Sequence, residues 1–186
     1  GAEEYPLYFD MWHEGQAMLL PETIISEKPY LIKVMIIAGS NPVITWPNSN
    51  KTGEALRKLD LLVVMDVFMT ATAEIADIVL PAATCFERTE FRDYGGLTCI
   101  PYAITRKKVT EPIGDSWPDW KFWFELARRM GCEEYFQWND VEDAINELIG
   151  PSGKTVEDFK RNINGITYGT KTYRTFEEGG FRTPSG

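Results

Sequence analysis

The sequence predicts an α/β fold with an open, mainly parallel sheet and helices on both faces. Two apolar runs, Leu31 to Ala38 and Leu61 to Met65, show little polar alternation. Strands of this composition occur where both faces of a parallel sheet are covered. A short helix is expected between them, over Thr52 to Leu59, with its apolar residues on one side. This order is a βαβ unit, and the predicted fold is therefore Rossmann-like.

Each of these two strands is predicted to stop at polar residues. The first runs into Gly39, Ser40, Asn41 and Pro42, and the second runs into Asp66. Open parallel sheets bind ligands beyond the carboxyl ends of their strands, so these residues are expected to share one rim. A plain turn after the strand would use the same residues, because Asn-Pro is itself a turn signal. The spacing is not the G-x-G-x-x-G pattern of nicotinamide enzymes.

Asp66 has two interpretations. A carboxylate at the end of a buried strand can accept two hydrogen bonds from the N1 and N2 donors of guanine, a match that adenine does not offer. Alternatively, it caps the turn into the segment that follows. In that segment Thr70 and Thr72 are expected to open a short helix, Ala71 to Ala76, as a hydroxyl cap and as a phosphate or ribose contact. Asp77 is expected to fix the next turn.

The wording of this stretch resembles a known family. The runs AGSNPVITWPN and LDLLVVMDVFMTATAEIADIVLPAATCFE are similar to the dinucleotide-binding domain of molybdopterin oxidoreductases of the dimethyl sulfoxide reductase family, which includes formate dehydrogenases, nitrate reductases and polysulfide reductases. The matching positions are Gly39, Asn41, Pro42, Asp66, Phe68, Thr70, Thr72, Ala73, Ala76, Asp77, Leu80 and Pro81. Ala71 departs from the usual glutamate, and the residues after Glu87 lack the family's glycine.

A second match lies at the other end of the chain. The run Phe181 to Gly186 resembles the family's F-x-T-P-S-G, which leads into a final β-barrel domain. The resemblance therefore implies a piece of a larger enzyme. We expect a loosely structured lead-in over residues 1–30, a dinucleotide-binding-like α/β domain over residues 31–162, and an extended tail over residues 163–186.

The resemblance also implies a function. The chain would be a domain of a molybdenum or tungsten bis(molybdopterin guanine dinucleotide) oxidoreductase, and it would bind the guanine dinucleotide end of that cofactor. The cofactor-binding residues carried over are Gly39, Ser40, Asn41, Pro42, Asp66, Phe68, Thr70 and Thr72. No catalytic or metal-ligating residue is expected here, because the metal would be held by parts of the parent enzyme outside this chain. The isolated chain is therefore expected to be inactive.

The expected partners are the remaining domains of the parent enzyme and its iron-sulfur electron-transfer subunits. A second interpretation is a cofactor-free structural or interaction module, like the related domain in the large peripheral subunit of NADH:quinone oxidoreductases. The presence of Asn41 and Asp66 favours the cofactor-binding interpretation.

Composition excludes other classes of function. The chain has 186 residues, a net charge of −9 and a pI near 4.7, which argue against a nucleic-acid partner. No run reaches the ~18 apolar residues that a membrane span needs, so direct membrane insertion is not expected. The three cysteines, Cys85, Cys99 and Cys132, have no metal-ligand spacing, and His13 is the single histidine.

The rest of the chain supplies the predicted covering elements. Helices are expected over Trp117 to Met130, Asn139 to Ile149 and Thr155 to Arg161, and a strand over Tyr102 to Val109. The aromatic stripe of the first helix is typical of core packing.

A charged loop is expected over Glu87 to Gly96. Its Arg88 and Arg92 either contact a pyrophosphate or remain solvated. The aromatic residues before Pro21 either form half of an interface or pack back on this domain, and a short helix over Met11 to Leu20 is the one element considered there.

Overall fold

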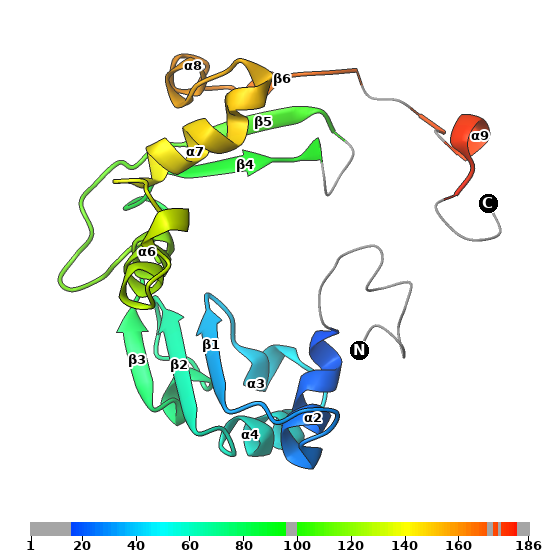
Figure 1. Cartoon of the computed structure of the whole chain (residues 1–186), viewed down its shortest axis with the longest axis vertical. Coiled ribbons are helices and arrows are strands. Elements are labelled where there is room, and N and C mark those ends of the chain that lie inside the picture. Colours follow the sequence, from blue (N-terminus) through cyan, green and yellow to red (C-terminus); the bar gives the residue numbers. More distant parts are fainter. Residues whose placement is uncertain (1–15, 96–99, 171–172, 175, 182–186) are drawn as a thin grey trace. The chain divides into compact units, whose positions relative to one another are not determined.

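The computed structural model describes residues 16–95, 100–170, 173–174 and 176–181 (Figure 1). The chain forms two compact units. The first contains the described residues up to Thr84 together with Pro112–Asp119, and the second contains Cys85–Glu111 together with the described residues from Trp120 onward. This division differs from the predicted boundaries at residues 30 and 162, because a chain crossing at residues 84 and 112 separates two sheets.

The first unit contains a parallel sheet of three strands. These are β1 (Val34–Ala38), β2 (Leu61–Asp66) and β3 (Ile78–Pro81), in that order across the sheet (Figure 1). The α/β class and the parallel sheet predicted from the apolar runs are confirmed. The first strand begins at Val34 rather than Leu31.

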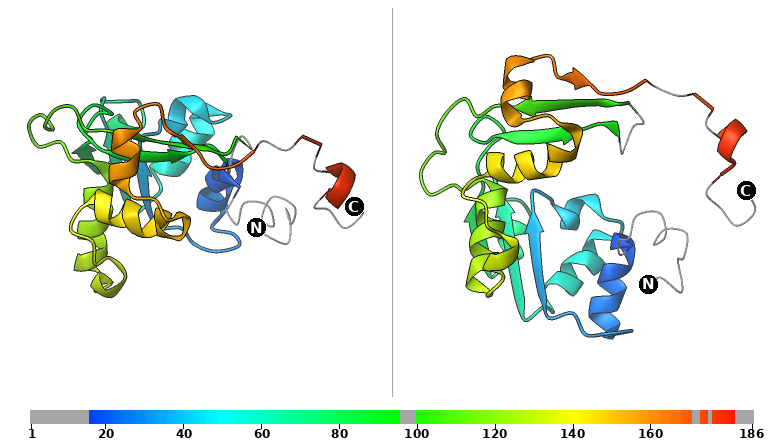
Figure 2. Two further views of the ribbon diagram at one scale, coloured as in Figure 1. Left: turned by 90° about the horizontal axis from the view of Figure 1, so that it is seen from above. Right: turned by 45° about the horizontal axis from the view of Figure 1, so that its top comes forward.

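Helices α2 (Leu20–Ser26) and α4 (Ser49–Leu56) pack with this sheet around one hydrophobic core (Figure 2). The buried members of that core are Ile24, Ile37, Ala55, Leu56, Leu59, Leu62, Val64 and Ala73. Val63 and Met65, which alternate with the core residues of β2, are also buried. Both faces of β2 are thus removed from water, as its unbroken apolar sequence predicts.

The ends of α4 differ from the prediction by a few residues. Asn48 caps the helix, because its side-chain oxygen accepts a hydrogen bond from the backbone N–H of Lys51 at 3.1 Å. The helix therefore starts before the predicted Thr52 and ends at Leu56 rather than at Leu59.

Part of the segment expected to be a loosely structured lead-in is helical. A short 3-10 turn at Ala17–Leu19 leads into α2, where Pro21 is tolerated because it lies in the first turn. Ile24 anchors α2 in the core. The aromatic residues Tyr5, Tyr8, Phe9 and Trp12 lie outside the described residues, as does most of the helix considered over Met11 to Leu20.

The second unit contains an antiparallel sheet in the order β4, β5, β6. Strand β5 (Tyr102–Arg106) lies between β4 (Glu90–Asp93) and the short β6 (Ile166–Thr167). The prediction of a loop over Glu87 to Gly96 was wrong for β4, whose charged sequence hides a strand that forms through pairing with β5. Likewise, β6 occupies part of the segment predicted to be an extended tail.

Three helices of the second unit lie close to their predicted positions. They are α6 (Asp119–Arg129), α7 (Val141–Ile149) and α8 (Val156–Arg161). The core beside the sheet comprises Ala103, Ile145, Ile149, Val156 and Phe159, with Phe91 packed edge-on against Phe159 at a ring-centroid distance of 5.3 Å. A single turn, α9 (Phe176–Gly179), lies near the end of the described chain.

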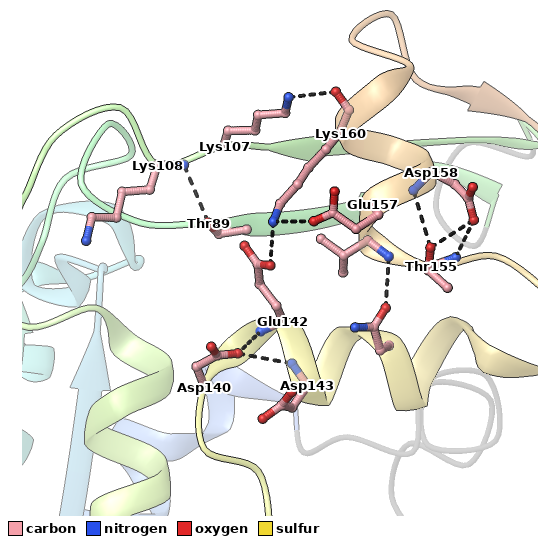
Figure 3. Close-up of polar contacts among 12 residues, drawn as sticks. Thr89, Lys107, Lys108, Asp140, Glu142, Asp143, Thr155, Glu157, Asp158 and Lys160 are labelled. Atoms are coloured by element: carbon pink, nitrogen blue, oxygen red, sulfur yellow. Dashed lines mark hydrogen bonds and ion pairs between the residues drawn. The ribbon is translucent and has the colours of Figure 1, made fainter.

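Local capping explains where α7 and α8 start (Figure 3). The Asp140 carboxylate accepts hydrogen bonds from two backbone N–H groups in the first turn of α7. Thr155 and Asp158 form a reciprocal capping box at the start of α8. Lys160 of α8 donates to Glu142 of α7 at 2.6 Å and to Glu157 at 2.8 Å. This last contact ties the two helices together.

The aromatic stripe of α6 packs in a core, as predicted. Phe124 is buried, and its ring centroid lies 5.4 Å from that of Trp120 and 5.3 Å from that of Trp138. Met130, which was expected to extend the stripe, is exposed instead. The helix ends at Arg129, so Met130 lies just beyond its last turn.

Candidate functional site

The carboxyl ends of β1 and β2 lie side by side. Ala38 pairs with Met65 across the sheet, and the Gly39 N–H donates a hydrogen bond to the Met65 carbonyl at 2.9 Å. Gly39 and Asp66 are therefore neighbours at one edge of the sheet, as the βαβ pattern predicts. We call residues 39–42 and 66–72 the rim.

Gly39 leaves open space at the rim. Its φ of +59° is a left-handed conformation that favours glycine, and no other heavy atom would lie within 4 Å of a Cβ placed there. The adjacent Ser40 is exposed. The backbone at this strand end is therefore accessible to a ligand.

Asn41 joins the first rim loop to the second. Its side-chain oxygen accepts hydrogen bonds from the Thr72 hydroxyl at 2.8 Å and from the Thr72 backbone N–H at 3.2 Å. The Thr72 hydroxyl oxygen in turn accepts from the backbone N–H of Val43 at 3.1 Å. Thr72 is 0% exposed, so its predicted place at the ligand surface is taken by its contacts with the other loop.

Pro42 starts a single helical turn rather than a plain loop. The turn is α3 (Pro42–Thr45), and the Asn41 carbonyl accepts hydrogen bonds from the backbone N–H groups of Ile44 and Thr45. Proline is tolerated at this first position because its missing donor would have no partner within the helix. The buried Pro42 ring thus shapes the loop from below.

The Asp66 carboxylate caps the turn after β2. Its Oδ1 accepts a hydrogen bond from the Phe68 backbone N–H at 3.1 Å, which is the turn-capping role considered from the sequence. Asp66 is half-buried. Because an ionised carboxylate has about four acceptor positions, this single bond leaves capacity for further donors.

The segment after Asp66 combines an exposed ring with a capped turn. Phe68 is 75% exposed. The Thr70 hydroxyl oxygen accepts from the Ala73 backbone N–H at 3.2 Å, as expected of a cap. The helix that follows is shorter than predicted, since it is a 3-10 turn over Ala73–Ile75.

Two arginines suggested for pyrophosphate contact belong to the second unit. The Arg88 Nε donates to a Glu90 carboxylate oxygen at 2.7 Å, and Arg92 is exposed on β4. The pyrophosphate role of both remains a prediction.

Metal and membrane features were also sought in the described parts of the chain. No group of three or more His, Cys, Asp or Glu side chains there is placed to hold a metal ion, and Cys85 and Cys132 are free thiols. Cys99 and His13 lie outside the described residues. No described helix combines the length and apolarity of a membrane span.

Comparison with known proteins identifies the family. Residues 17–129 match the family model for molybdopterin oxidoreductases. The chain is 37% identical over 164 residues to the acetylene hydratase of Syntrophotalea acetylenica, an alignment that covers 87% of this chain and 22% of the relative. It is 34% identical over 154 residues to the assimilatory nitrate reductase catalytic subunit of Bacillus subtilis, covering 82% of this chain and 20% of the relative.

The structure gives the same relationship. The solved acetylene hydratase from Pelobacter acetylenicus superposes with a TM-score of 0.69 at 36% identity, covering 76% of this chain and 19% of that one. The chain thus spans about a fifth of the length of these relatives. The matched residues include the whole parallel sheet and both rim loops. The chain belongs to the molybdopterin oxidoreductase family.

Proposed function

We propose that the first unit binds the guanine dinucleotide end of a molybdopterin guanine dinucleotide cofactor within a larger enzyme. Family membership supports a molybdopterin cofactor. The observation that carries the nucleotide assignment is the juxtaposition of Gly39 and Asp66 at the carboxyl ends of adjacent parallel strands. This is the location at which open parallel sheets bind their ligands.

The first rim loop suits the phosphate part of such a ligand. Gly39 has no side chain, and the space where a Cβ would lie is open, so a phosphate could approach the backbone closely. The exposed Ser40 offers a hydroxyl donor beside it. These two residues would bind the phosphate through neutral groups.

Asp66 suits the base. The N1–H and N2–H groups of guanine are two parallel donors, and the two oxygens of a carboxylate are two parallel acceptors. Adenine presents an acceptor at N1, so it cannot make the same pair. The bond from Phe68 N–H to Oδ1 holds the carboxylate in a fixed orientation while both oxygens keep further acceptor capacity.

Phe68 offers a surface for the face of the base. Its ring is exposed and follows Asp66 by two residues, on the same turn. Stacking on an aromatic ring contributes about 1–3 kcal/mol per base in single-stranded nucleic-acid complexes. The ring would add affinity for any base, whereas Asp66 would select guanine.

The metal centre would lie outside this chain. When bound, the molybdenum or tungsten ion supplies the two-electron chemistry, and the protein supplies binding and orientation. We therefore expect the isolated chain to be inactive. Its partners would be the other domains of the parent enzyme and iron-sulfur electron-transfer subunits.

A second candidate function is that of a cofactor-free interaction module. One observation favours it: Asn41, Thr72 and Asp66 each make hydrogen bonds within the unit, as purely structural residues would. On this hypothesis the rim would have no affinity for a nucleotide. The two functions therefore differ in a measurable property.

Titration of the 186-residue chain with GDP and with guanosine, followed by backbone amide shifts, tests the proposal. Shifts confined to residues 39–42 and 66–70 are expected, with a dissociation constant of about a millimolar, since few contacts are available. GDP should bind more tightly than guanosine if Gly39 and Ser40 contact phosphate. Shifts scattered over both units, or none at all, would favour the interaction module.

A further inference from the structure

The two rim loops are joined by a buried hydrogen-bond network centred on Thr72. Its hydroxyl donates to the side-chain oxygen of Asn41 at 2.8 Å and accepts from the Val43 N–H at 3.1 Å. Its backbone N–H donates to the same Asn41 oxygen at 3.2 Å. All three bonds cross from one loop to the other. They link residues that are 29 or 31 positions apart in the sequence.

We propose that Thr72 is a positioning residue: it does not contact the nucleotide but holds the Gly39–Pro42 loop against the Asp66–Thr72 loop in the binding conformation. This inference rests on the proposed function. The full burial of Thr72 argues against direct contact. The residues with access to a ligand are instead its neighbours on the two loops, Ser40 and Phe68.

The network is suited to this role because its members are mutually satisfied. A buried threonine hydroxyl has one donor and two acceptor positions, and here it uses its donor and one acceptor on the same opposite loop. Removing the hydroxyl would leave the Val43 N–H without this acceptor. An unsatisfied buried group is costly, so the first loop would shift or open to water.

The test compares three variants of the 186-residue chain. Thr72→Val keeps the shape of the side chain and removes the hydroxyl, whereas Thr72→Ser keeps the hydroxyl. Thr52→Val is the matched control, because Thr52 is an equally buried threonine of the same unit whose hydroxyl makes one long bond, 3.4 Å, to the Pro47 carbonyl. It lies in α4, away from the rim loops in the sequence.

Two quantities are measured for each variant: hydrogen exchange of the Val43 amide without ligand, and affinity for GDP. In Thr72→Val, we expect faster Val43 exchange and an affinity for GDP about three- to tenfold lower, the effect of losing one hydrogen bond. Thr72→Ser should restore both quantities to within about twofold of the parent chain. Thr52→Val should leave both unchanged. If Thr72→Val does not fold, Thr72→Cys, with its weak thiol donor, takes its place.

The inference is overturned if Thr72→Val exchanges at Val43 and binds GDP like the parent chain, or if Thr72→Ser is as impaired as Thr72→Val. Failure of the proposed function has a different signature, since the parent chain would then show no GDP binding at the rim. In that case the exchange measurement alone decides whether Thr72 couples the loops, and unchanged Val43 exchange refutes the coupling.

Discussion

The Asp77 carboxylate accepts a hydrogen bond from the backbone N–H of Leu62 at 2.7 Å, and the Asp77 N–H donates to the Leu62 carbonyl at 3.0 Å. This exchange ties the residue before β3 to the start of β2. Asp77 was expected to fix a local turn, but its carboxylate instead links the two parallel strands at their amino ends. The contact fixes the position of β3 along β2.

Replacing Asp77 with Ala should destabilise the first unit by about 1.5–3 kcal/mol, because a hydrogen bond to a charged acceptor is lost. Asp77→Asn keeps one acceptor oxygen and should cost less. Urea unfolding measures the change. Asp60→Ala is the control, since Asp60 pairs with Lys33 on the surface at 3.3 Å with both side chains more than half exposed, and such pairs contribute little. Equal effects of the Asp77 and Asp60 substitutions to Ala would contradict this role of Asp77.

The sequence predicted the parallel sheet well because its signal is local. Strands β2 and β3 end within a residue of their predicted limits, since an apolar run and a following Asp or Pro are visible without knowledge of the partner strand. Strand β4 carries no such signal. Its residues Glu90–Asp93 are mostly charged, and they form a strand because β5 supplies hydrogen-bond partners from a later part of the chain.

The candidate site was predicted with the same limits. The neighbouring positions of Gly39 and Asp66 follow from parallel pairing, which the βαβ pattern implies. The burial of Thr72 does not follow from any local pattern, because it depends on Asn41, a residue 31 positions earlier. A threonine after a strand is equally compatible with a ligand contact and with a buried link.

Gly39→Ala should destabilise the chain by about 1 kcal/mol. The cause is backbone strain, because φ at this residue is +59° while the space around a Cβ is open. Gly53→Ala is the matched control within the same unit: Gly53 lies inside α4, where alanine is favoured by about 0.5–1 kcal/mol and only the flexible end of Arg57 is close. Thermal unfolding should therefore move in opposite directions for the two variants. A Gly39→Ala chain as stable as the parent would show that the loop relaxes.

In the second unit, the hydrogen bond and charge of Lys160 hold the pKa of Glu157 below its ordinary value of 4.5 (Figure 3). Because the folded pKa is the lower one, this contact stabilises the folded state above pH 4.5, and the contribution is lost as the pH falls through the folded pKa. Lys160→Met should raise the pKa of Glu157 toward its ordinary value. Carboxyl chemical shifts recorded against pH measure this change.

Asp158 provides the internal control for that titration. Its pKa is lowered mainly by hydrogen bonds from Thr155, first the backbone N–H and then the hydroxyl. Lys160→Met should therefore leave the pKa of Asp158 nearly unchanged. A parallel rise of both pKa values would mean that the substitution disturbs α8 as a whole rather than one ion pair.

The most direct test of the account concerns the selectivity of Asp66 for guanine. GDP and ADP are titrated into the parent chain, into Asp66→Asn and into Asp60→Asn, which changes an acidic residue at the opposite end of β2. Asp66→Asn can still accept from the Phe68 N–H but presents a donor in place of one carboxylate oxygen. We predict that the parent chain and Asp60→Asn prefer GDP over ADP by roughly tenfold or more, and that Asp66→Asn loses this preference. Equal binding of GDP and ADP to the parent chain, or an undiminished preference in Asp66→Asn, would contradict the guanine-binding role of the rim.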